Sequence, residues 1–126
     1  MNKEFIPYEQ ALALKELGFD EDCLAYYSGQ ETHSLIAYWT ISKEKAVNEK
    51  MVIAPLYQQA FRWFREEFGL WVEMSQPKTW LLSISDKKQN KIILLEDYDN
   101  YVEPTSYEEA ELACLKKLIQ IVNQNK

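Results

Sequence analysis

The chain has 126 residues, of which 47% are hydrophobic and 13% aromatic, and its formal net charge is −6 at pH 7. A chain of this length and apolar content fits one folded unit, so we expect a single domain over residues 1–126 and exclude a disordered protein. The negative charge argues against general affinity for nucleic acid or for anionic membranes, because both need a cationic surface.

Residues 7–17 have the pattern of a short helix. Pro7 stands at its start, Gly18 follows its end, and apolar residues recur between them at helical spacing. Two β-rich runs follow, residues 23–27 and 35–41, and the polar loop between them contains a glycine, which predicts a hairpin. Residues 42–50 are rich in charge, and their pattern leaves open whether they form a loop or one short helical turn.

Residues 55–69 have the clearest helical pattern in the chain. Pro55 suits the first helical position, because its fixed φ matches the helix and its missing N–H would have no partner there. Gly69 suits the left-handed residue that closes a helix. The apolar residues between them form one stripe: Leu56, Tyr57, Ala60, Phe61, Trp63, Phe64 and Phe68. We therefore expect this helix to bury its aromatic side in the core.

Three further β-rich runs follow, at residues 70–75, 79–85 and 91–98, and the short polar linkers between them predict a meander. The last helix is predicted to begin at Ser106, where Glu109 three residues later fits a capping box. Its wide apolar face predicts a largely buried helix. The order α-β-β-α-β-β-β-α predicts an α+β fold in which an antiparallel sheet packs against three helices.

Two segments carry a resemblance to known proteins. Residues 55–66, which include Gln-Gln-Ala-Phe-Arg-Trp-Phe-Arg, and residues 107–119, which begin Tyr-Glu-Glu-Ala-Glu-Leu-Ala-Cys, resemble small uncharacterised proteins encoded by phages and by integrated elements of gut anaerobes. Residues 5–19 are similar to the same group. The resemblance implies a phage or mobile-element origin. It implies no activity, cofactor or catalytic residue.

Few residues suggest chemistry. His33 is the single histidine and has no cysteine or carboxylate at metal-ligand spacing. Cys23 and Cys114 lie in apolar runs, which predicts buried, reduced thiols. The three glycines are too few for a phosphate-binding loop. The acidic run 96–103 has the alternating carboxylates of a calcium loop but lacks the central glycine of an EF-hand, so a solvated acidic loop is favoured. We expect no enzyme, cofactor or metal.

Two basic groups are candidate binding residues. Arg62 and Arg65 are the only arginines, and they lie one turn apart on the polar edge of the predicted 55–69 helix, where they could grip a carboxylate or a phosphate. The alternative is a solvated helix edge with local ion pairs. Lys87, Lys88 and Lys91 surround a predicted turn, where they could contact phosphate or keep the turn soluble.

Trp71 is a candidate of another kind. If Leu70, Val72 and Met74 face the helices, strand alternation turns Trp71 and Glu73 to the opposite side. An exposed tryptophan is typical of an interaction surface. The alternatives are a reversed register or a second face that is also covered.

The leading hypothesis from the sequence is a non-enzymatic protein-interaction module of phage or mobile-element origin that uses Arg62, Arg65 and Trp71. Its partner is an unidentified protein, with a homodimer as one alternative. Because the chain shows no signal sequence and no apolar run long enough to span a bilayer, we expect a cytoplasmic protein without membrane contact. A second hypothesis is a nucleic-acid-associated protein that uses a local Arg/Lys patch, and a third, poorly supported by a charge of −6, is an acidic decoy of nucleic acid.

Overall fold

A computed structural model describes residues 2–27, 35–41 and 52–125 of the chain. The chain divides into two compact units, Met1–Gln59 and Ala60–Lys126. His33 and the undecided segment 42–50 lie outside the described residues. The expectation of one domain over residues 1–126 stays a prediction.

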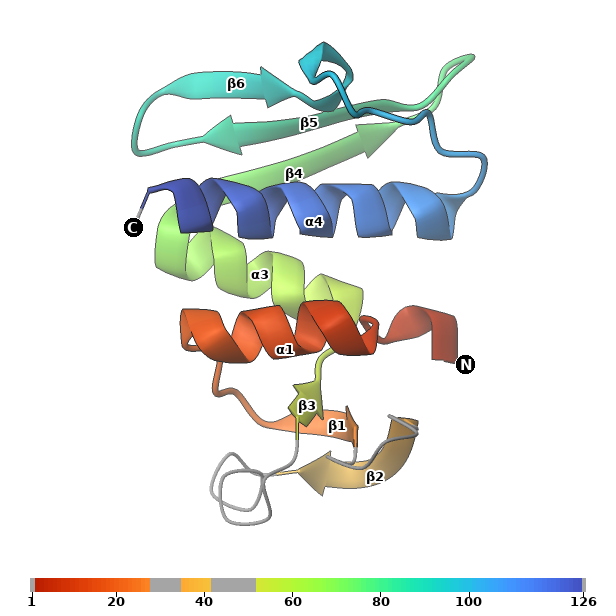
Figure 1. Cartoon of the computed structure of the whole chain (residues 1–126), viewed down its shortest axis with the longest axis vertical. Helices are drawn as coiled ribbons and strands as arrows, with labels where there is room; N and C mark the ends of the chain where they lie inside the picture. The colour runs from red at the N-terminus through yellow and green to blue at the C-terminus, as the bar shows by residue number, and fades with distance from the viewer. Residues whose placement is uncertain (1, 28–34, 42–51, 126) are drawn as a thin grey trace. The chain divides into compact units, whose positions relative to one another are not determined.

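The first unit contains a short 3-10 turn, one helix and a three-stranded sheet. Its elements are η1 (Asn2–Glu4), α1 (Tyr8–Leu17), β1 (Cys23–Tyr27), β2 (Leu35–Ile41) and β3 (Val52–Ala54). Strands β1 and β2 pair antiparallel, which confirms the predicted hairpin. The sequence did not predict β3, which pairs antiparallel with the other side of β1, so the strand order is β2-β1-β3. Figure 1 shows α1 in red and orange beside this sheet.

Polar and aromatic contacts fix the amino-terminal segment to this sheet. The Tyr27 hydroxyl donates a hydrogen bond of 2.8 Å to the carbonyl oxygen of Ile6, and the Tyr27 ring meets that of Tyr8 edge to face at 5.5 Å. The N–H of Ile6 donates to the carbonyl oxygen of Pro55, and Phe5 forms a β-bridge with Leu56. These contacts hold the segment before α1 against the chain that follows β3.

The helices begin slightly later than the prolines predict. Pro7 is the N-cap of α1 rather than its first residue, and its ψ of 162° is extended. Helix α3 (Tyr57–Phe68) begins two residues after Pro55, so the prediction that Pro55 occupies the first helical position is wrong. The reason is tertiary, because the bonds of Pro55 to Ile6 and of Leu56 to Phe5 keep this stretch extended.

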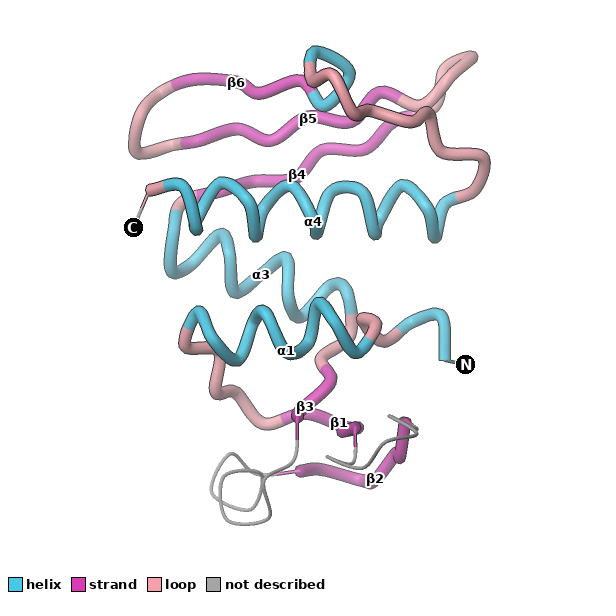
Figure 2. Tube along the Cα trace, in the orientation of Figure 1, coloured by secondary structure: helices cyan, strands magenta, loops and turns pink. Residues whose placement is uncertain are grey.

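The second unit contains most of α3, a three-stranded meander and the last helix. Its strands are β4 (Leu70–Ser75), β5 (Leu81–Asp86) and β6 (Lys91–Leu94), and a 3-10 turn, η2 (Leu95–Asp97), precedes α4 (Tyr107–Gln124). The order β4-β5-β6, with both pairs antiparallel, confirms the predicted meander. Strand β5 begins two residues later than predicted, and β6 ends at Leu94 because the chain turns into η2. Helix α4 packs along one face of the sheet, against β4 and β5 (Figures 1 and 2).

The mixed α+β class and the predicted order of helices and strands are confirmed, with β3 as an additional strand before α3. Within the described residues the strands form two three-stranded antiparallel sheets, where the sequence led us to expect one. The strands of each sheet come from one side of α3 in the chain, so each sheet is built from neighbours in sequence.

The aromatic side of α3 and the apolar face of α4 are buried, as predicted. Among the stripe residues of α3, Leu56, which precedes the helix, and Phe68 are half-buried and the others are buried. The Trp63 ring meets those of Phe64 and Phe68 edge to face, at 5.1 and 5.2 Å. Gly69, with φ of +67°, closes α3 in the left-handed conformation that the sequence predicts.

The amino terminus of α4 has the predicted cap. The Ser106 hydroxyl oxygen accepts a bond of 3.2 Å from the N–H of Glu109. The Glu109 carboxylate reaches back one residue further than a capping box requires, and accepts from the N–H and the hydroxyl of Thr105 at 3.1 and 2.9 Å. These two bonds, which stabilise the charged carboxylate, lower the pKa of Glu109.

Replacing Ser106 with alanine is expected to lower the free energy of unfolding by about 0.5–2 kcal/mol, because the Glu109 N–H loses its acceptor. Urea denaturation followed by circular dichroism measures the loss. The matched control is Ser75→Ala at the exposed end of β4, where we expect a change within about 0.5 kcal/mol. Equal losses in the two variants would contradict a capping role for Ser106.

Candidate functional site

The register of the second sheet decides which side chains share its outer face. Trp71 pairs with Ser85, and Ser85 with Ile92. The next row on the same side joins Glu73 to Ser83 and Ser83 to Leu94, and the last pairs Ser75 with Leu81. The outer sheet face is therefore made of Trp71, Glu73, Ser75, Leu81, Ser83, Ser85, Ile92 and Leu94. The alternate residues, which include Val72, Ile84 and Ile93, point to the side that α4 covers.

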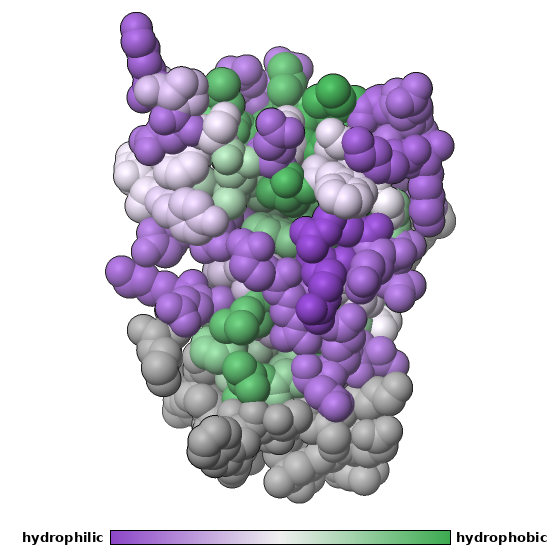
Figure 3. Space-filling model, turned by 180° about the vertical axis from the view of Figure 1, so that it is seen from behind, coloured by the Kyte–Doolittle hydropathy of each residue, from purple (hydrophilic) through white to green (hydrophobic). Residues whose placement is uncertain are grey.

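The outer sheet face exposes large apolar side chains. The exposed fraction is 70% for Ile92, 49% for Trp71, 46% for Leu81 and 42% for Leu94. The middle strand β5 contributes two serines between the larger side chains of β4 and β6. Seen from behind, hydrophobic residues in green reach the surface in the upper part of the picture, with hydrophilic residues in purple on both sides (Figure 3). The outward orientation of Trp71 that strand alternation predicted is confirmed.

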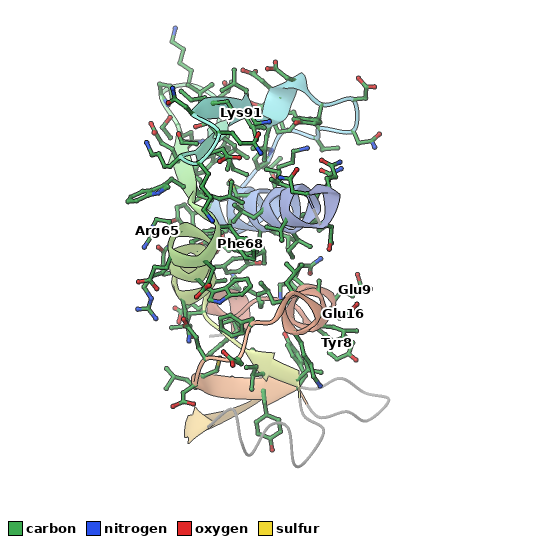
Figure 4. The ribbon with its side chains drawn as sticks, turned by 90° about the vertical axis from the view of Figure 1, so that its left-hand side faces the viewer. Tyr8, Glu9, Glu16, Arg65, Phe68 and Lys91 are labelled. Carbon is green, nitrogen blue, oxygen red and sulfur yellow. The ribbon has the colours of Figure 1, made fainter. Side chains whose placement is uncertain are left out.

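Two cations lie over the Trp71 ring. The Arg65 guanidinium carbon is 5.5 Å from the ring centroid, and the Lys87 ammonium is 5.9 Å from it. Both distances allow a cation–π interaction, which at an exposed ring contributes about 0.5–1 kcal/mol. Figure 4 shows Arg65 on the outer side of α3. Arg65 comes from α3, Trp71 from β4 and Lys87 from the β5–β6 turn. The structure thus brings together Trp71, one of the two predicted arginines and one of the three predicted lysines.

The β5–β6 turn has a fixed geometry that positions Lys87. The N–H of Lys87 donates a bond of 2.9 Å to the carbonyl oxygen of Gly69. The buried Asp86 carboxylate accepts bonds of 3.1 Å from the N–H groups of both Lys88 and Gln89. Asn90 completes the turn in the left-handed region, with φ of 54°. Lys87 is therefore held beside the start of β4, where Trp71 lies.

The other predicted site residues lie outside this cluster. Arg62 is within 4.0 Å of the Glu66 carboxylate, which is the local ion pair that the sequence offered as an alternative. The Lys88 ammonium donates to the carbonyl oxygen of Glu67 at 3.3 Å, so Lys88 places its charge at the carboxyl end of α3. Lys91, labelled in Figure 4, is exposed, but its pairing with Asp86 turns it to the opposite side of the sheet from Trp71.

The residues that suggested metal or thiol chemistry stay apart. Cys23 and Cys114 are buried free thiols, as predicted. Over residues 2–27, 35–41 and 52–125, no three His, Cys, Asp or Glu side chains come together as metal ligands would. The acidic run 96–103 follows β6 as the turn η2 and a loop, and two of its tyrosines, Tyr98 and Tyr101, line a pocket against α4.

Sequence reasoning missed the three other large apolar residues of the outer sheet face: Leu81, Ile92 and Leu94. The signal was present, because alternation along each strand separates Leu81 from Leu82, and Ile92 and Leu94 from Ile93. What the sequence does not give is the pairing register that joins these residues to Trp71 across three strands.

Comparisons with protein-family models, with curated proteins and with solved structures gave no match. No helix in the described part of the chain has the length and apolar character to cross a membrane.

Proposed function

We propose that this protein is a non-enzymatic protein-interaction module and that the outer sheet face is its contact surface. The observation that carries the proposal is the exposure of Trp71, Leu81, Ile92 and Leu94 on one side of one sheet. Clustered exposed apolar side chains with a polar rim are typical of interaction sites in soluble proteins. The sequence supports the non-enzymatic part, since it offers no catalytic constellation.

The cations around Trp71 indicate the chemistry of the partner. A partner that covers this face would remove water from the charges of Arg65 and Lys87, which costs free energy. Acidic groups at the rim of the partner's own contact surface would compensate for that cost. A second copy of this chain is one such partner, because Glu73 lies on the same face and could pair with Arg65 or Lys87 of the other copy. Trp71 would be the main anchor, since tryptophan carries a large share of binding energy at interfaces.

The setting in which the module acts is also a proposal. The resemblance of residues 55–66 and 107–119 to proteins of phages and integrated elements supports such an origin. A protein of this origin would act in the cytoplasm of the host cell, on a host or phage protein.

The proposal predicts that Ile92→Glu and Trp71→Ala abolish partner binding. Ile92→Glu places a charge in the outer sheet face, and Trp71→Ala removes its main anchor. The immobilised 126-residue chain and its variants are incubated with host-cell lysate, and sedimentation measures the self-association of the same proteins. The matched control is Leu24→Glu, which changes an exposed apolar residue of β1 in the other sheet. A partner or dimer kept by the control and lost by both face variants supports the proposal. Equal retention by all three variants, or none by the wild type, contradicts it.

A second candidate function is binding of single-stranded nucleic acid, favoured by one observation. An exposed tryptophan flanked by Arg65 and Lys87 could stack a base while the cations contact phosphate. This function predicts that a fluorescent oligonucleotide binds at low ionic strength, that affinity falls steeply with salt, and that Arg65→Ala weakens it. Absence of binding at low salt would remove this candidate and leave the protein-interaction proposal intact.

A further inference from the structure

A pocket of about 500 Å³ lies between α4 and the segment that follows β6. Its volume is within the range of small-molecule sites, roughly 300–1,000 Å³. Leu95, Tyr98 and Val102 form one wall, and Leu112 and Ala113 of α4 form another. The lining is mostly apolar, so the few charged groups in it decide which ligands it can hold.

Lys117 is the most unusual of these groups, because it is a charged residue with only 7% of its surface exposed. Its ammonium lies 2.9 Å from the centroid of the Tyr98 ring and donates a bond of 2.8 Å to the side-chain oxygen of Gln120. An ammonium has three N–H donors, and these contacts engage two of its sides. A buried charge is costly unless an opposite charge accompanies it. Within the described residues, no carboxylate forms an ion pair with Lys117.

The remaining charges at the pocket do not supply the missing anion. The Glu109 carboxylate lines the pocket, but both of its oxygens accept hydrogen bonds from Thr105. Lys116 adds a second, exposed ammonium to the lining. Burial raises the pKa of Tyr101, helped by the nearby carboxylates of Glu103 and Glu96 and by Cys114, so the phenol of this lining residue keeps its proton and can donate a hydrogen bond. The pocket therefore offers two ammonium groups and hydrogen-bond donors above an apolar floor, and the Glu109 carboxylate in its lining is bound to Thr105.

We propose that this pocket binds a small organic monocarboxylate with an apolar body. The carboxylate pairs with the Lys117 ammonium, and the apolar body lies against Tyr98, Val102 and Leu112. One buried ammonium matches one negative charge, which favours a monocarboxylate over a phosphate dianion. This site is separate from the outer sheet face, so the proposal does not depend on the proposed interaction function.

The test titrates the isotope-labelled 126-residue chain with phenylbutyrate, with the uncharged phenylbutanol and with inorganic phosphate, and follows amide resonances by NMR. We expect phenylbutyrate to shift the signals of residues 95–102 and of α4 saturably. Phenylbutanol should bind at least about tenfold more weakly, because it lacks the charge-assisted bond. Phosphate should leave these signals unshifted.

Two variants assign the effect to Lys117. Lys117→Met should weaken phenylbutyrate binding by about tenfold or more and leave phenylbutanol unaffected, whereas Lys116→Met should change it far less. Should Lys117→Met fail to fold, Val102→Glu decides, since it places a competing carboxylate at an 81% exposed position of the lining. It should weaken the binding of phenylbutyrate more than that of phenylbutanol, which loses only its apolar contact with Val102. Equal affinity for acid and alcohol, no saturable shift at millimolar ligand, or full binding of phenylbutyrate by Lys117→Met or, where that variant does not fold, by Val102→Glu would overturn the proposal.

Discussion

Phe64→Ala is expected to lower the free energy of unfolding by about 3–5 kcal/mol, the typical cost of deleting a buried phenylalanine ring. Phe64 has no exposed surface, and its ring lies 5.1 Å from that of Trp63 and 5.9 Å from that of Phe68. A loss of this size is a large part of the roughly 5–15 kcal/mol that stabilises an ordinary domain. Denaturant unfolding followed by circular dichroism measures it.

Trp71→Ala is the matched control for Phe64→Ala. It removes a larger aromatic side chain, but one that is 49% exposed, so we expect a loss of no more than about 1 kcal/mol. The same variant is expected to abolish partner binding. A comparable loss of stability in the two variants would show that the aromatic side of α3 is not a packed core.

Raising the pH from about 9 to 12 is expected to unfold the protein through its two thiols. Burial raises the pKa of Cys23 from 9.0 to about 12, and the carboxylates of Glu21 and Asp22 add to the shift. Burial, with a smaller contribution from Glu111, likewise raises the pKa of Cys114 to about 12. The pKa of each thiol is higher in the folded protein than in the unfolded chain, so the protonated thiols favour the folded state. Their contribution to the free energy of unfolding is fully present below pH 9 and is lost as the pH approaches 12.

Linkage gives the size of the effect as about 1.4 kcal/mol for each thiol and each pH unit in that window. Denaturant unfolding at a series of pH values measures the slope. Burial also raises the pKa values of Tyr27, Tyr101 and Tyr107, so the comparison is with the double variant Cys23→Ala and Cys114→Ala, which keeps the tyrosines. Parallel slopes in the two proteins would contradict buried thiols.

Local signals predicted most of the secondary structure. Gly69 and Ser106 mark the ends of their helices because left-handed geometry and side-chain capping depend on only a few neighbouring residues. The start of α3 was misplaced because Pro55 and Leu56 are held extended by Ile6 and Phe5, which lie far away in the chain. The division into two sheets was missed for the same reason, since strand pairing is a tertiary choice.

The candidate site was predicted in part. Arg65 could be predicted from the polar edge of one helix, and Trp71 from the alternation of one strand. That Lys87 joins them depends on the β5–β6 turn, in which the Asp86 carboxylate and the Gly69 carbonyl fix the backbone. Lys117 lies three residues after Cys114 and four before Ile121, which is the spacing of the buried face of α4. This position could be read from the sequence, but a charged residue is not expected on a buried face.

The short turns of the β4-β5-β6 meander have a consequence for the order of folding. Residues 76–80 and 87–90 are the only links between its strands, so pairing closes small loops and can occur early. The paired sheet displays Ile92 and Leu94 on β6, an edge strand of the described sheet. Unpaired edges of this kind invite pairing with other chains. The brevity of β6 and the exposed charge of Lys91 at its start oppose such pairing between chains.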